Sequence, residues 1–125
     1  MRLLLDTHCL LWWLDDPALL SDAARTAIRD GRNAAYVSAA TVWEIVIKKA
    51  AGKLEAPNDL DAALAACRFH CLAVTVAHAL ALGSLPALHR DPFDRMLVAQ
   101  ATVEGLTLVS RDPEVLRYPV PSLVA

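Results

Sequence analysis

Four acidic residues stand alone beside apolar segments, and they are the strongest chemical feature of this chain. They are Asp6 after Leu3 to Leu5, Glu44 within Val42 to Ile47, Asp94 in the segment from Asp91 to Arg95, and Asp112 after Leu108 to Arg111. An unpaired carboxylate placed against a core costs several kcal/mol or shifts its pKa. A hard cation with oxygen ligands would balance all four charges. The set therefore predicts a magnesium or manganese site whose waters include a nucleophile.

Each acid also has an ordinary structural explanation. Asp112 precedes Pro113 and suits a helix N-cap, while Asp94 lies three residues after Asp91, where an acid favours the helix dipole. Glu44 stands four residues before Lys48, the spacing of a surface ion pair worth a few tenths of a kcal/mol. Asp6 has no equally obvious cap role. Taken singly, each acid leaves both explanations open.

Length and composition indicate one domain over residues 1–125. The hydrophobic share of 56% suggests an apolar core, a surface reserved for a partner, or both. A net charge of −2 provides no global basic field, although local basic clusters remain possible. Polar residues, a glycine and a proline interrupt the charge-free stretch 71–88, which argues against a membrane span. Three cysteines without a disulfide pattern and no secretory signal indicate a cytoplasmic protein.

Apolar strands alternating with helices predict an α/β domain with a short, mostly parallel sheet. We expect strands at 3–5, 35–37, 72–76 and 107–110. We expect helical segments at 8–14, 22–30, 39–51, 59–67, before Pro86, from Asp91-Pro92 to Gly105, and after Asp112-Pro113. Ligands bind such sheets at the carboxyl ends of strands. Asp6, Asp94 and Asp112 are therefore expected to converge at one edge of the sheet.

Several segments together resemble the PIN-domain family, specifically VapC-type toxin ribonucleases. The resemblance covers essentially the whole chain, and the order Asp, Glu, Asp, Asp in these contexts is more specific than any single pair. The matching segments are Leu5 to His8 with Leu10 to Leu14, Ser38 to Ile45, Arg90 to Ala101, and Leu108 to Asp112. The resemblance implies a three-layer α/β/α domain and a divalent-metal-dependent endoribonuclease, the toxin of a VapBC-like pair.

The same resemblance assigns roles to individual residues. Asp6, Glu44, Asp94 and Asp112 match the acids that bind Mg²⁺ or Mn²⁺, and Thr7 and Ser110 match supporting hydroxyl positions. Asp91 matches either an outer-shell acid or the N-cap of the helix at Pro92, and Pro92 favours the cap. RNA phosphodiesters would be hydrolysed by a metal-activated water, so no histidine is needed as a base. A VapB-type antitoxin and a homodimer are the implied protein partners.

Two other classes of function remain as alternatives. A noncatalytic α/β interaction module would account for the apolar surplus. An Asp-dependent phosphotransfer or receiver domain would also place an acid after the first strand. The dehalogenase type of that class requires a second acid where this chain has His8, and the nearest acids that receiver domains would use are Asp15 and Asp16. Metal-dependent RNA cleavage distinguishes these classes.

The segment from Cys9 to Leu14 is apolar all round its helix and contains Trp12 and Trp13. Adjacent helical side chains lie about 100° apart, so one sheet cannot bury both indoles. We therefore expect one tryptophan in a homodimer interface or in a groove for an antitoxin helix. The alternative is that the helices from Asp22 and Ala39 cover the whole turn.

Overall fold

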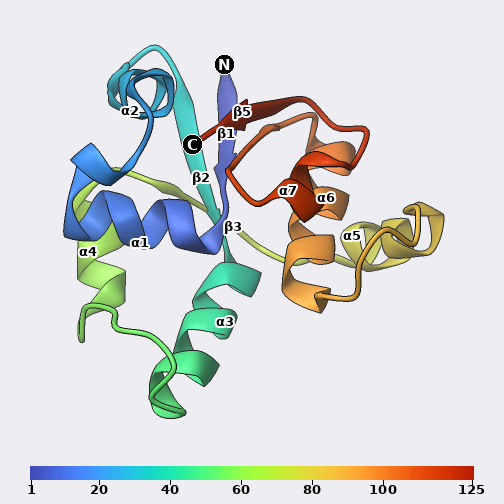
Figure 1. The fold of residues 1–125 in the computed structure, drawn as a ribbon, viewed down its shortest axis with the longest axis horizontal. Coiled ribbons are helices and arrows are strands. Elements are labelled where there is room, and N and C mark those ends of the chain that lie inside the picture. The colour runs from blue at the N-terminus through green and yellow to red at the C-terminus, as the bar shows by residue number, and fades with distance from the viewer.

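The computed structural model describes all 125 residues and contains one five-stranded sheet, which is parallel throughout (Figure 1). The strands are β1 (Arg2–Leu5), β2 (Ala34–Ser38), β3 (His70–Leu72), β4 (Thr107–Ser110) and β5 (Ser122–Val124), in the order β3-β2-β1-β4-β5. The chain builds outward from β1 to β2 and β3 on one side, and later to β4 and β5 on the other. The topological switch point, where ligands of such sheets bind, therefore lies between β1 and β4.

Helices cover both faces of the sheet, as predicted. The first group is α1 (Thr7–Asp15), the short η1 (Pro17–Leu19), α2 (Asp22–Arg29), α3 (Ala39–Ala50) and α4 (Leu60–Ala66). The second group is α5 (Val76–Ala81), the short η2 (Leu82–Ser84), α6 (Pro92–Glu104) and α7 (Pro113–Leu116). Figure 1 shows α1, α2 and α4 on one side of the strands and α6 with α7 on the other, while α3 extends beyond the end of β2.

The central strand places its leucines alternately in two cores. Leu3 and Leu5 pack in one core with Cys9 and Leu10 of α1, whereas Leu4 packs in the other core with α6. All three leucines are fully buried. Burial on both faces explains why β1 is a continuous apolar run and not an alternating one. It also fixes the end of β1, and with it Asp6, between the two layers of helices.

The third predicted strand was misplaced, and a fifth strand was missed. Residues 72–76 were expected to be extended, but β3 ends at Leu72 because Thr75 starts α5. The Thr75 hydroxyl accepts a hydrogen bond from the His78 backbone N–H, while the His78 ring accepts one from the Thr75 N–H. This reciprocal cap favours the helix over the strand. The missed β5 has three residues and pairs with β4 at the sheet edge.

No helix has the length and apolar character needed to cross a membrane. The three cysteines are free, with Cys9 buried and Cys71 exposed on the edge strand β3.

Candidate active site

Asp6 follows β1 and begins α1. Its carboxylate accepts a hydrogen bond from the Cys9 backbone N–H at 2.9 Å, so Asp6 is the N-cap of α1. This role was not evident from the sequence, because the helix begins at the next residue, Thr7, without an intervening turn. Asp6 is 6% exposed. Burial and the Asp6 carboxylate raise the pKa of the Cys9 thiol, which remains protonated beside the acid.

Glu44 lies on α3 with both carboxylate oxygens hydrogen-bonded. Thr7 donates its hydroxyl to Oε1 at 2.6 Å, and Lys48 donates its ammonium to Oε2 at 2.5 Å. The Lys48 pair suggested by the spacing does form, and of the two explanations left open for Glu44 the ordinary surface pair is excluded, because the carboxylate is buried. Glu44 is 3% exposed, and its bond from Thr7 links α3 to α1. Because the group is desolvated, losing either donor would leave a buried carboxylate oxygen unpaired.

Asp91 and Asp94 lie at the start of α6. Asp91 is its N-cap, as Pro92 predicted, and accepts hydrogen bonds from the backbone N–H groups of Phe93 and Asp94 at 2.9 and 3.1 Å. Burial raises the pKa of Asp94 from 3.8 to about 6, helped by the negative charges of Asp91, Asp112 and Glu44 and opposed by a hydrogen bond from His89. Negative charge therefore accumulates at this end of the sheet.

His89 is a residue whose place the sequence did not reveal. Its Nε2 lies 3.3 Å from Asp94 Oδ2, and its Nδ1 lies 2.8 Å from the hydroxyl of Tyr118, which is itself buried. Arg95 donates to the same hydroxyl at 2.9 Å. The Tyr118 hydroxyl can therefore donate its proton to His89 Nδ1. The histidine ring then carries its own proton on Nε2 and donates it to Asp94. The closeness of His89 to Asp94 in sequence was the available signal, and nothing indicated Tyr118.

Asp112 lies two residues after the end of β4 and is the exposed member of the four acids. Its carboxylate caps α7 by accepting the Glu114 N–H at 2.9 Å, and its own N–H donates to the fully buried Ser110 hydroxyl at 3.1 Å. The cap confirms the structural explanation for Asp112. Ser110 therefore orders the backbone of the turn that carries the acid.

The elements that carry these residues meet near the carboxyl ends of the strands, where α1 follows β1 and α3 follows β2 (Figure 1). The charges of Asp91, Asp112 and Glu44 act on Asp94 there. Asp6 is tied to β4 through its N–H to the Val109 carbonyl at 3.1 Å. No group of three or more His, Cys, Asp or Glu side chains is close enough together to hold a metal ion as the side chains lie. The oxygen-only donors, and the carboxylates of Asp91, Asp112 and Glu44 whose charges raise the pKa of Asp94, nevertheless fit a hard divalent cation. Its binding requires the carboxylates to draw closer.

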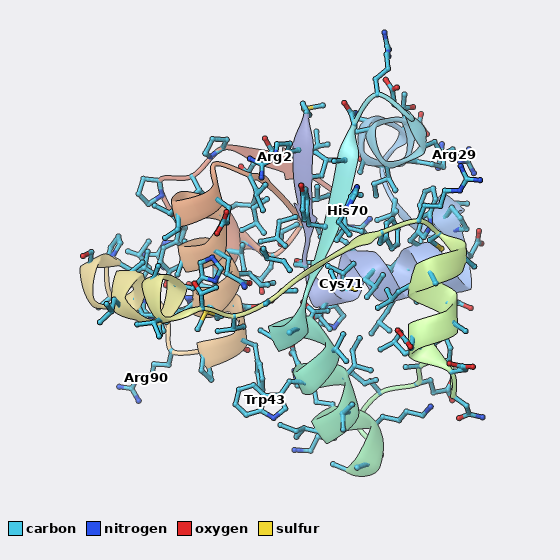
Figure 2. All side chains as sticks on the ribbon, turned by 180° about the vertical axis from the view of Figure 1, so that it is seen from behind. Arg2, Arg29, Trp43, His70, Cys71 and Arg90 are labelled. Carbon is cyan, nitrogen blue, oxygen red and sulfur yellow. The ribbon has the colours of Figure 1, made fainter.

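Trp12 and Trp13 are both half-buried. Trp13 packs against Phe69 and beneath the Arg29 guanidinium, with ring-centre distances of 6.4 and 5.7 Å respectively. Arg111 covers Trp12 at 4.1 Å, and the same indole lines a cavity of about 370 Å³. Trp43 is the most exposed of the three tryptophans, at 62%. Figure 2 shows it projecting from α3 toward the start of α6, where it meets Phe93 at 5.1 Å.

This chain belongs to the PIN domain family, which it matches over residues 3–121. Among solved structures, it is similar to a chain of the VapBC2 complex from Rickettsia felis bound to a promoter DNA fragment, with 16% identity and a TM-score of 0.73. That match covers 100% of this chain and 99% of the other. No curated protein matches the sequence.

Two further complexes have the same fold. A chain of DNA-bound VapBC from Salmonella typhimurium is 19% identical with a TM-score of 0.72, and the match covers 99% of this chain and 98% of that one. A chain of FitAcB from Neisseria gonorrhoeae is 19% identical with a TM-score of 0.61, over 97% and 96% of the two chains. The predicted family and the three-layer α/β/α fold are thus confirmed.

Proposed function

We propose that this protein is a divalent-metal-dependent endoribonuclease and the toxin of a VapBC-like pair, acting on RNA in the cytoplasm. Membership of the PIN domain family, whose members are generally nucleases, supports the hydrolytic activity. The observation that carries the proposal is that the acids follow β1 and β4 and stand at the start of α6, at the end of the sheet where such folds bind ligands. The raised pKa of Asp94, caused by burial and by the charges of Asp91, Asp112 and Glu44, supports it.

The side chains of this site have separable tasks. Asp6, Glu44, Asp94 and Asp112 would hold Mg²⁺ or Mn²⁺, which when bound supplies an activated water and neutralises charge developing on the phosphate. Thr7 orients Glu44 through its 2.6 Å hydrogen bond, and His89 orients Asp94. Ser110 orders the turn before Asp112. Asp91 acts from the second layer as the α6 cap that positions Asp94.

Cleavage of RNA by the purified protein tests this proposal. We expect cleavage with magnesium or manganese, its loss with a chelator, and products that carry 5′-phosphate. Asp6→Asn and Asp94→Asn should each lower the rate at least about 100-fold, the scale on which preorganised charge acts in catalysis. Asp59→Asn is the matched control, because Asp59 caps α4 away from this site and asparagine also caps.

The alternative outcomes are distinct. A folded Asp94→Asn variant that cuts at the wild-type rate would mean that the site is assigned wrongly. A wild-type protein that binds a partner but cuts no RNA would indicate the noncatalytic interaction module. Phosphate covalently attached to Asp6 would revive the phosphotransfer class.

The cavity beside Trp12 supports an antitoxin-binding groove. Leu11 and Leu14 of α1 and Pro57 of the α3–α4 loop line it together with Trp12, and Glu55 supplies negative charge. An apolar helix with basic residues, from a VapB-type antitoxin, would suit this surface. Trp12→Ala should weaken antitoxin binding with little loss of stability, whereas Trp13→Ala should mainly lower stability. If both variants lose only stability, the antitoxin binds elsewhere.

A second surface supports the homodimer. Exposed apolar side chains project from α3 and from α5, and an apolar pocket lined by Trp43 and Leu82 lies between these elements. The exposed side chains are Trp43 at 62%, Val46 at 60%, Val76 at 76% and Leu80 at 73% exposed. Leu80→Glu should shift the protein to monomers in sedimentation. An unchanged dimer would place the contact on another face.

A further inference from the structure

Lys48 is the only lysine or arginine that forms an ion pair with one of the four candidate acids. Its ammonium bonds Glu44 Oε2, while the side chain remains 35% exposed against 5% for that of Glu44. The two nearby arginines are engaged differently. Arg95 donates to Tyr118 and to the Pro86 carbonyl, and Arg111 donates to the carbonyls of Ala125 and Leu19. Lys48 therefore supplies the nearest mobile positive charge to the carboxylates.

The surroundings of Lys48 extend beyond its hydrogen bond. The hydrogen bond that Lys48 donates to Glu44 raises the pKa of Lys48 against the opposing effect of burial, and the charges of Glu44, Asp91 and Asp94 raise it further. The ammonium thus lies in the field of carboxylates from both α3 and the start of α6. This is where the proposed cation would also be held, because Glu44 and Asp94 are two of its four ligands.

Each carboxylate oxygen of Glu44 accepts one hydrogen bond, and the ammonium on Oε2 both occupies a lone pair and repels a divalent cation. Thr7 is neutral and 4% exposed at the start of α1, so its hydroxyl can stay on Oε1 beside a bound cation. Lys48 has a long, flexible side chain that is partly in solvent. Of the two donors, Lys48 is the one that can vacate Glu44 at low cost.

We propose that Lys48 competes with the divalent cation as a tethered ammonium: it neutralises Glu44 in the metal-free protein and leaves Glu44 when the ion binds. This inference rests on the proposed metal site and adds its regulation. The internal pair stabilises the metal-free fold and weakens metal binding, because each binding event must break it.

Calorimetric titration of Mn²⁺ into RNA-free protein tests the inference. We expect Lys48→Met to bind Mn²⁺ about tenfold more tightly than wild type, while its metal-free form melts several degrees lower. Lys48→Arg keeps a cation and should bind Mn²⁺ within about threefold of wild type. Lys53→Met is the matched control, because Lys53 is exposed and makes no side-chain contact with an acid. It should bind Mn²⁺ within about twofold of wild type.

Lysine accessibility detects the displacement directly. Brief acetylation with acetic anhydride, followed by mass spectrometry, should modify Lys48 at least threefold faster when Mn²⁺ is present, and Lys53 equally in both states. Unchanged Lys48 reactivity, or Lys48→Met that binds Mn²⁺ no more tightly, would overturn the competition. These results differ from failure of the metal site itself, in which wild type and Asp94→Asn both show no Mn²⁺ binding.

Discussion

The two halves of the candidate site balance their negative charge in different ways. In the half formed by Asp6, Thr7, Glu44 and Lys48, each carboxylate is nearly buried and each has a donor. In the half formed by His89, Asp91, Asp94 and Asp112, carboxylates lie near one another without a lysine or arginine bonded to them, and the pKa of Asp94 rises to about 6. The first half is held together by hydrogen bonds, and the second is electrostatically strained. A bound cation would relieve mainly the second half.

The largest expected effect comes from a substitution in the hydrogen-bonded half of the site. Thr7→Val keeps the shape of the side chain but removes the donor to Glu44 Oε1, leaving a charged, buried oxygen unpaired. We expect a loss of about 3 kcal/mol in the free energy of unfolding, measured in urea. Thr41→Val is the matched control, since the Thr41 hydroxyl is buried without a partner and its loss should cost nothing. Equal effects for the two variants would contradict the account of Glu44.

The next effect concerns the strained half and depends on pH. The pKa of Asp94 in the folded chain, about 6, exceeds its ordinary 3.8, so the folded state holds the proton more tightly. The stability from this group is complete below pH 4 and is lost as pH rises to about 6. The difference corresponds to about 2 kcal/mol after allowance for partial exposure. The metal-free Asp94→Asn variant should therefore show no such loss of stability as pH rises from 4 to about 6. Urea titrations of the variant and the wild type at these pH values would reveal the difference.

A smaller effect tests whether the Tyr118 hydroxyl positions His89. Tyr118→Phe removes the group shared by His89 and Arg95 and should cost about 1 kcal/mol. His89 should then lose its fixed orientation toward Asp94, which the ring-nitrogen shifts in NMR would report. A variant whose His89 tautomer stays as in wild type would show that the ring is positioned by other contacts.

The smallest effect removes one charge from the strained half. Asp112→Asn keeps a side chain able to cap α7 but lessens the repulsion on Asp94. The metal-free variant should gain about 0.5 kcal/mol or stay unchanged, as expected for an exposed charge. Much of the rise in melting temperature with Mn²⁺ should disappear. A wild-type melting temperature that does not respond to metal would count against the four-acid site.

The sequence was most informative where local rules determine the structure. Leu3 to Leu5, Ser21, Pro92 and Gly105 each indicate a strand or a helix end, and the structure has these features at those places. The positions of β3 and β5 were not predictable in the same way, because short edge strands depend on pairing with distant partners and not on their own pattern. Contacts between distant elements also decide which groups a single side chain bonds and how deeply it is buried.

The acids illustrate this limit within the site. Their spacing and the apolar residues around them indicated that they belong together. Spacing also predicted the bond between Glu44 and Lys48, and the apolar residues around Glu44 indicated that its carboxylate would not be simply solvated. The bond from Thr7, which joins α1 to α3, could not be predicted from either segment alone. The contact between His89 and Tyr118 joins residues 29 positions apart and was likewise invisible in the sequence.

The strand order has a consequence for how the protein is made. During synthesis, β1 can pair with β2 early, but its other edge and Asp112 await residues 107–112. The Tyr118 hydroxyl and the bond from the Ala125 N–H to Ser110 arrive later still. A nascent chain on the ribosome therefore carries Asp6 and Glu44 well before it can complete the constellation, since pairing across large sequence separations comes late. The candidate site as described therefore forms only after the chain through Ala125 has been made, and α1 to α4 can fold before it.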